Sequence, residues 1–269
     1  MKFWLPLTLL GLFLYSCSTP ENNNRGNVTF KTTKDSIIVI YENKLLCPVF
    51  TKIENLKTGA LNFIQSEARE TTQILRFNTN QEDSISILKT YKFKHYYGYH
   101  NLKKQAYDTL FNYALPFQKG RQYKIIQGYN GNFTHNTNFS RYTIDFNLNI
   151  GDTIVASRNG TVIKVIDKHN KQGTTKKYKP YGNYILIHHK DDTFSQYVHL
   201  KQNGALVKVG DSVKINEPIA LSGFTGLTTT PHLHFGIFKP TKNGFVSIPT
   251  ILNSIPGKKY TKNKIAKND

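Results

Sequence analysis

The sequence predicts an all-β fold, and three observations support this. Apolar and β-branched residues recur in short runs bounded by Gly, Asn and Asp, a pattern typical of strands separated by turns. Between residues 28 and 100, the only helical periodicity is a weak one at residues 64–74. Gly-Asp pairs at 151–152 and 210–211 each lead into a β-forming run. This repetition predicts two similar β units packed against each other, with Asp152 and Asp211 as turn residues.

The first half of the chain, residues 28–107, is expected to form a small β-sandwich domain. Its strand candidates are residues 36–41, 74–77 and 86–91. His95 and His100 lie among tyrosines and lack a suitably spaced partner, so we interpret them as packing or surface residues. No residue pattern in this half predicts a catalytic or binding site.

The second half, residues 108–269, is long enough for one well-buried core, since a domain of ~150 residues hides about 68–70% of its unfolded surface. Its strand candidates are residues 141–148, 161–166, 183–188 and 193–200. A polar loop rich in Lys and Gly, residues 169–181, separates two of these strands and could border a cleft.

The first residues predict export. Residues 3–14 form an almost wholly apolar run, too short to span a bilayer but typical of a signal peptide. Leu-Tyr-Ser-Cys at its end resembles a lipobox, which predicts a signal peptide at 1–16, lipidation of Cys17 and a polar tether over 17–27. An ordinary secretory signal cut near Ser16 is the alternative. The expected location is the periplasmic side of a bacterial envelope, with the outer membrane as the favoured anchor.

Charge and cysteine content limit the partners. Lys and Arg number 36 against 17 Asp and Glu, a formal charge of +19, which favours anionic partners. For an exported protein we expect the anionic envelope and no nucleic acid. Cys47 is the only cysteine besides Cys17, so we expect no disulfide and interpret Cys47 as a core residue. The basic tail at 258–267 is predicted to be flexible and solvated.

Histidines and one aspartate are the candidate site residues. His232 and His234 alternate on a predicted strand and therefore share a face, where they could hold a metal or divide metal binding and proton transfer between them. Asp145 alternates with the apolar Ile144 and Phe146, and a buried carboxylate needs a partner or a metal. Surface histidines and a solvated strand face are the alternatives for these residues taken singly.

An ordered set of residues resembles the lysostaphin-type, or LytM-like, zinc endopeptidases of peptidoglycan. The set is His135, Asp145, Tyr-x-His-Leu ending at Leu200, and Pro-His-Leu-His-Phe at 231–235, and the resemblance covers about residues 112–240. It implies a β-rich peptidase domain of the duplicated hybrid motif kind. It also implies one zinc ion per chain and hydrolysis of peptide cross-links between peptidoglycan peptide stems.

The resemblance assigns roles by position. His135, Asp145 and His234 match the zinc ligands, and His199 and His232 match two catalytic histidines. In much of the family the first ligand stands four residues before the aspartate, where this chain has Arg141. A Gly-Tyr-Asn-Gly loop resembles members with longer spacing and favours His135. No His-Glu-x-x-His motif is present, so proton transfer would fall to histidines.

A second class of function remains open. The alternative is a non-catalytic envelope module that binds the cell wall or a partner hydrolase and regulates that hydrolase, as the resemblance implies for family members that have lost ligands. This chain keeps all five positions, which favours the enzyme.

Overall fold

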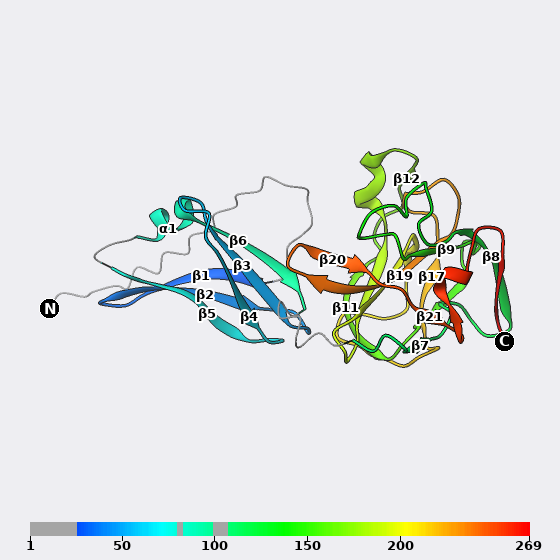
Figure 1. The fold of residues 1–269 in the computed structure, drawn as a ribbon, viewed down its shortest axis with the longest axis horizontal. Helices are drawn as coiled ribbons and strands as arrows, with labels where there is room; N and C mark the ends of the chain where they lie inside the picture. Colours follow the sequence, from blue (N-terminus) through cyan, green and yellow to red (C-terminus); the bar gives the residue numbers. More distant parts are fainter. Residues whose placement is uncertain (1–25, 80–82, 99–106) are drawn as a thin grey trace.

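The computed structural model describes residues 26–79, 83–98 and 107–269 (Figure 1). Its secondary structure is almost entirely strand, so the all-β prediction is confirmed. The predicted signal peptide and Cys17 lie outside the described residues. No helix in the described ranges is long and apolar enough to cross a membrane.

Two three-stranded sheets form the N-terminal part. Their strands, in sheet order, are β1 (Gly26–Thr32), β2 (Ser36–Asn43) and β5 (Thr71–Asn78), then β4 (Leu61–Ser66), β3 (Val49–Asn55) and β6 (Tyr91–Tyr97). The sheets share one core, to which β2 contributes Val39 and β3 contributes Val49 and Ile53. Two sheets facing across a core are a sandwich arrangement. Residues 26 and 27 of the predicted tether belong to β1.

Two local expectations for this part were wrong. Residues 86–91 were predicted as a strand, but Ser84–Thr90 is the helix α1. The Asp83 side chain accepts hydrogen bonds from the main-chain N–H groups of Ile85 and Ser86, and this cap stabilises a helix against the β-forming residues within it. The weak helical pattern at 64–74 falls on β4 and β5, where pairing with β3 and β2 outweighs it.

The largest sheet belongs to the C-terminal part. Its strands in sheet order are β16 (Ser212–Val213), β11 (Gly160–Ile166), β13 (Tyr184–His188), β14 (Phe194–Val198), β19 (Leu233–Thr241), β9 (Ile144–Phe146), β8 (Arg121–Gln127) and β23 (Ile265–Asn268). β20 (Gly244–Ser247) forms a hairpin with β19.

Smaller sheets complete this part. They are β10 (Thr153–Val155), β17 (Pro218–Ser222) and β15 (Leu200–Ala205); β12 (Gln172–Gly173) and β18 (Gly226–Leu227); and β22 (Ile255–Pro256), β21 (Ile251–Leu252) and β7 (Asn112–Tyr113). Two short 3-10 helices are η2 (Lys176–Tyr181) and η3 (Gly257–Lys259).

The two Gly-Asp turns are alike, since Asp152 and Asp211 each accept a hydrogen bond from the main-chain N–H three residues earlier.

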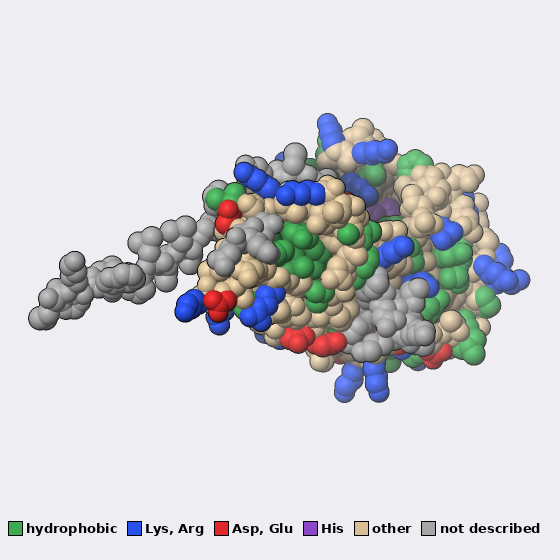
Figure 2. All heavy atoms as spheres, turned by 60° about the vertical axis from the view of Figure 1, so that its left-hand side comes forward, with side chains coloured by type: hydrophobic (Ala, Val, Ile, Leu, Met, Phe, Trp, Pro, Cys, Tyr) green, Lys and Arg blue, Asp and Glu red, His purple; other side chains and the backbone are tan. Residues whose placement is uncertain are grey.

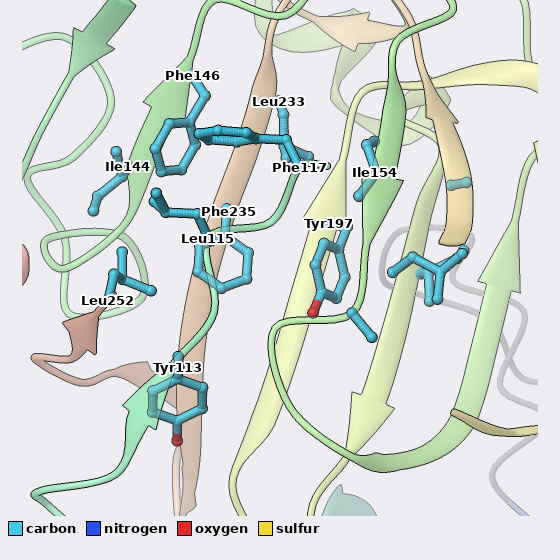
Figure 3. Packing of buried hydrophobic residues seen from close by; sticks show 14 of the residues in the cluster. Tyr113, Leu115, Phe117, Ile144, Phe146, Ile154, Tyr197, Leu233, Phe235 and Leu252 are labelled. Carbon is cyan, nitrogen blue, oxygen red and sulfur yellow. The ribbon is translucent and has the colours of Figure 1, made fainter. Parts of the chain in front are cut away.

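The main core lies on one face of the large sheet. Ile144, Phe146, Leu233, Phe235 and Tyr197 are all buried there and pack together (Figure 3). Because side chains alternate along a strand, the residues between them point to the opposite face. The packing of these core residues therefore fixes which side chains of β9, β14 and β19 point toward the core and which point away from it.

The basic tail was expected to be flexible, and the structure corrects this for its last residues. β23 pairs with β8, and the buried Ala266 and Asn268 alternate with the exposed Ile265 and Lys267. The Asn268 side chain donates to the main-chain oxygen of Phe117. The pairing gives the tail backbone hydrogen bonds that a solvated end lacks.

The N-terminal part packs against the other face of the large sheet. One apolar cluster joins Cys47 and Tyr97 to Leu186, Phe194 and Phe238 of the sheet. Cys47 is fully buried, in agreement with its interpretation as a core residue. The division of the chain at residue 108 stays a prediction.

Candidate metal centre

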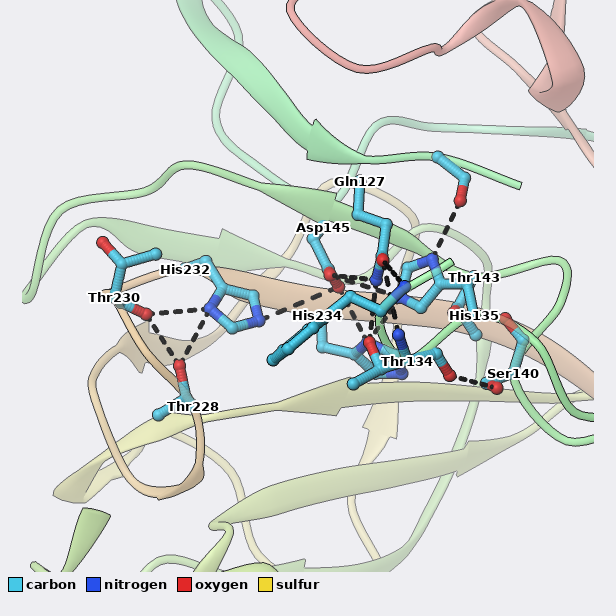
Figure 4. Close-up of polar contacts among 12 residues, drawn as sticks. Gln127, Thr134, His135, Ser140, Thr143, Asp145, Thr228, Thr230, His232 and His234 are labelled. Atoms are coloured by element: carbon cyan, nitrogen blue, oxygen red, sulfur yellow. Dashed lines mark hydrogen bonds and ion pairs between the residues drawn. The ribbon is translucent and has the colours of Figure 1, made fainter. Parts of the chain in front are cut away.

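His234 and Asp145 meet across two paired strands. In the register of β19 with β9 they are direct partners, and the His234 Nδ1 atom lies 2.8 Å from Asp145 Oδ1 (Figure 4). The side chain of Asp145 is buried, as is most of that of His234. Both point away from the core because Ile144, Leu233 and Phe235 face it. The sheet register thus builds half of the site.

His135 reaches the same point from a loop. The chain folds back after β8, with His135 N–H bonded to the Gly131 carbonyl, and the imidazole is fully buried. Its Nε2 atom lies 3.2 Å from Asp145 Oδ2 and 3.3 Å from His234 Nδ1. Gly131 permits the turn, since a Cβ atom there would lie 2.3 Å from the Gln127 side chain. The long spacing to Asp145 is therefore taken up by this loop.

The donor chemistry of the three side chains fits a metal ion. His135 Nδ1 lies 3.0 Å from the Gly128 carbonyl, which can only accept, so Nδ1 carries the proton and Nε2 is free to bind. One donor atom from each of His135, Asp145 and His234 lies within 4.8 Å of the others. Two nitrogens and a carboxylate that face one another in a buried space need protons or a cation between them. Such a set with room for a further ligand suits zinc.

Burial and charge determine protonation in the cluster. Burial alone raises the pKa of Asp145, but His234 and His135 beside it hold that pKa well below its ordinary value. Burial lowers the pKa of His234, an effect that the Asp145 carboxylate partly offsets. An ionised carboxylate and an unprotonated imidazole are the forms that bind a metal.

His199 and His232 lie beside the cluster without joining it. Their ring centroids are 4.5 Å apart, and His199 lies 6.1 Å from the His234 ring. His199 Nδ1 donates to the Thr225 carbonyl at 2.7 Å, and His232 Nδ1 donates to the Thr230 carbonyl at 2.9 Å. Each ring therefore keeps its Nε2 atom for other chemistry, and His232 Nε2 lies 3.8 Å from Asp145 Oδ1.

His199 takes its position through its backbone. Strand alternation along the predicted strand 193–200 predicts that His199 shares the face of Tyr197, which lies in the core. The structure corrects this, because β14 ends at Val198 and His199 adopts a positive φ of 68°. This left-handed conformation turns the imidazole to the site face. Burial, with His232 and His234 nearby, lowers the pKa of His199 to about 3, so the ring is neutral at neutral pH.

Three supporting residues carry no signal that the sequence alone could reveal. The Gln127 side chain donates to Asp145 Oδ2 at 3.2 Å and to Thr134 Oγ1 at 2.7 Å (Figure 4). Thr228 Oγ1 lies 3.2 Å from His232 Nδ1, and Thr225 supplies the carbonyl for His199.

Two further histidines of this part make other contacts. His188 pairs with Asp192 at 2.9 Å, and His189 is buried with its Nδ1 atom 2.8 Å from the Asn159 carbonyl. Arg141, which stands at the alternative ligand position, lies over the Tyr142 ring. Neither histidine belongs to the metal-capable group among the described residues.

An all-β domain with a buried His-Asp-His cluster and two flanking histidines has the make-up of a metallopeptidase domain. Residues 140–246 match the family described as Peptidase family M23, so the chain carries an M23 peptidase domain. The match includes Asp145, His199, His232 and His234, whereas His135 lies just before it.

Named relatives agree with this assignment. The chain is 32% identical over 177 residues to an uncharacterized metalloprotease of Buchnera aphidicola, covering 63% of this chain and 44% of that protein. It is 40% identical over 94 residues to the peptidoglycan DD-endopeptidase ShyB of Vibrio cholerae, covering 35% of this chain and 19% of that protein. The solved catalytic domain of lysostaphin from Staphylococcus simulans is 28% identical, with 59% of this chain and 93% of that chain covered and a TM-score of 0.31. The chain thus spans less than half of either curated relative.

Proposed function

We propose that this protein is a zinc metalloendopeptidase that hydrolyses peptide cross-links of peptidoglycan. The observation that carries the proposal is the grouping of five side chains: His135, Asp145 and His234 form a metal-capable set, and His199 and His232 lie beside it. Zinc on this set would supply a Lewis acid and a bound water with a pKa of about 7. The endopeptidase names of relatives, ShyB among them, support the substrate class.

The two flanking histidines are suited to proton transfer. Their Nδ1–H groups are fixed on main-chain carbonyls, so each ring is held in one tautomer with Nε2 unprotonated, and His232 Nε2 lies 3.8 Å from Asp145 Oδ1. His199 is neutral at neutral pH, so its Nε2 atom carries a lone pair that can accept a hydrogen bond from water. A histidine that holds a proton at Nε2 can donate a hydrogen bond to a developing oxyanion. Asp145 is committed to His135 and His234 and is poorly placed to act as the base.

The test is digestion of purified peptidoglycan by the full-length, zinc-loaded protein, with the products separated and identified by mass spectrometry. We expect cleaved cross-links, loss of cleavage after chelation and recovery on adding zinc. The matched control is a His199→Ala protein that still folds and binds zinc. If the wild-type protein binds the wall but leaves its cross-links uncleaved, the proposal is contradicted and the non-catalytic module is favoured.

We also propose that Cys17 anchors the protein to a membrane on the periplasmic side of the envelope, with the outer membrane as the favoured site. The support is the Leu-Tyr-Ser-Cys run behind an apolar segment. The strand β1 begins at Gly26, so the polar residues from Cys17 up to it would separate the lipid from the first sheet.

A further inference from the structure

Residues 168–181, which we term the lysine lobe, are attached to the segment that positions the two flanking histidines. The lobe's short strand β12 pairs in parallel with β18, and Thr228 N–H donates to the Gly173 carbonyl at 3.0 Å. Thr225 and Thr228, at the two ends of this segment, contact His199 and His232. The lysine lobe therefore lies at the rim of the candidate metal centre.

Asn183 holds the base of the lobe. This residue is fully buried, and its side chain donates to the His169 carbonyl at 2.8 Å and accepts from His169 N–H at 3.0 Å. Its main-chain N–H donates to Thr225 Oγ1 at 3.1 Å. Gly226 lies so close to Gly182 that an added Cβ atom would be 2.5 Å from the Gly182 Cα atom. The lobe is thus fixed at its base relative to the site.

The lobe carries positive charge without counter-charge. It has five exposed lysines and no acidic residue; the lysines are Lys168, Lys171, Lys176, Lys177 and Lys179. None of them forms an ion pair with a residue in the described part of the chain. Lys171 and Lys177 lie 5.1 and 5.2 Å from the ring centroids of tyrosines in the same lobe. Figure 2 shows Lys or Arg side chains on the uppermost lobe and histidine in the hollow below it.

We propose that the lysine lobe binds free carboxylates of the substrate, so that the site prefers acidic peptides; this rests on the proposed function. Uncompensated cations beside a concave site raise the local concentration of anions. The ammonium groups sit on long, exposed side chains, so their attraction is screened by salt and acts on binding more than on the chemical step. Cross-linked peptide stems that carry free carboxylates would meet this requirement.

The experiment compares two probes on the full, zinc-loaded protein: a purified cross-linked muropeptide dimer, and the same dimer after its carboxylates have been converted to amides. The variant is the double substitution Lys176→Glu and Lys177→Glu. The matched control, Lys264→Glu with Lys267→Glu, makes the same charge change at exposed positions beside or on β23, the edge strand that β8 and β9 separate from β19.

We expect the lobe variant to raise KM for the acidic dimer about tenfold, with kcat nearly unchanged and zinc retained. KM for the amidated dimer should stay unchanged, and the control should alter neither. An equal loss on both probes, or none, would overturn the role of the lobe. If no dimer is cleaved at all, the proposed function fails. In that case, calorimetric binding of the two dimers tests the role of the lysine lobe separately. The wild type should bind the acidic dimer more tightly than the amidated one, and the lobe variant should not. Equal binding of both dimers by the wild type would refute the role of the lobe.

Discussion

His234 Nδ1 lies 2.8 Å from Asp145 Oδ1, and the two residues are direct partners in the β9–β19 register. This contact depends on the pairing of two strands whose opposite faces are locked in the main core. A one-residue slip of either strand would send its site residue into that core. The sheet register therefore fixes the relative positions of these two side chains.

Gln127→Leu should weaken zinc binding by about 10–100-fold, because Gln127 donates to the Asp145 carboxylate and orients it. The measurement is a zinc titration against a competing chelator. Gln122→Leu on the same strand is the matched control, since Gln122 is exposed. Equal zinc affinities for the two variants would show that Gln127 does not support the ligand set.

Thr228→Val should slow cleavage about tenfold while leaving zinc bound. Thr228 Oγ1 donates to the Thr230 carbonyl at 2.8 Å and contacts His232 Nδ1, so its loss should loosen the histidine. Steady-state kinetics should show the effect in kcat with little change in KM. Thr229→Val, at an exposed neighbour, should behave as wild type. If Thr228→Val changes only the melting temperature and not kcat, the role of Thr228 is purely structural.

His189 should make the protein less stable as the pH falls below neutrality. Burial lowers the pKa of His189 to about 3. The unfolded chain, with a histidine pKa near ~6.5, then binds more protons than the folded one between these values. The contribution of the neutral His189 ring to the free energy of unfolding is complete above pH ~6.5 and declines toward pH ~3. Between pH 7 and pH 5 this contribution should fall by about 2 kcal/mol.

Urea unfolding at both pH values tests this in the wild type and in His189→Gln, which retains a side-chain N–H for the Asn159 carbonyl. The variant should lose less stability than the wild type on acidification. Identical losses would contradict the assignment. Both His189→Gln and His188→Gln should keep stoichiometric zinc, since neither side chain belongs to the metal-capable group.

Cys17→Ser should move the protein from the membrane to the soluble fraction, or stop its processing, because lipidation needs the thiol. Cell fractionation and immunoblotting measure this, with Cys47→Ser as the cysteine control that should stay in the membrane. Detergent-dependent membrane association of the Cys17→Ser protein would refute the anchor.

The sequence predicted the sheet-borne half of the site for a clear physical reason. Strand alternation alone places His232 with His234, and Asp145 opposite Ile144, and the structure has this arrangement. Alternation failed at His199, where a positive φ reverses the side chain, and such a backbone break has no periodic signature. It also failed at Ser84–Thr90, where the Asp83 cap selects a helix over a strand.

The loop-borne part of the site could not be predicted from strand alternation. His135 was placed in the set by resemblance, and its approach depends on how residues 128–140 fold back over Gln127. Gln127 and Thr228 are common polar residues whose roles arise only from distant partners. Long-range contacts of this kind leave no trace in residue spacing.

Bound zinc, measured by elemental analysis across five folded alanine variants, tests the central claim most directly. His135→Ala, Asp145→Ala and His234→Ala each remove one of three ligands and should lose most of the metal along with activity. His199→Ala and His232→Ala leave the ligands intact, so they should keep about one zinc per chain while cleavage falls about 10²–10⁴-fold. Full zinc in His135→Ala, or none in His232→Ala, would contradict the assignment.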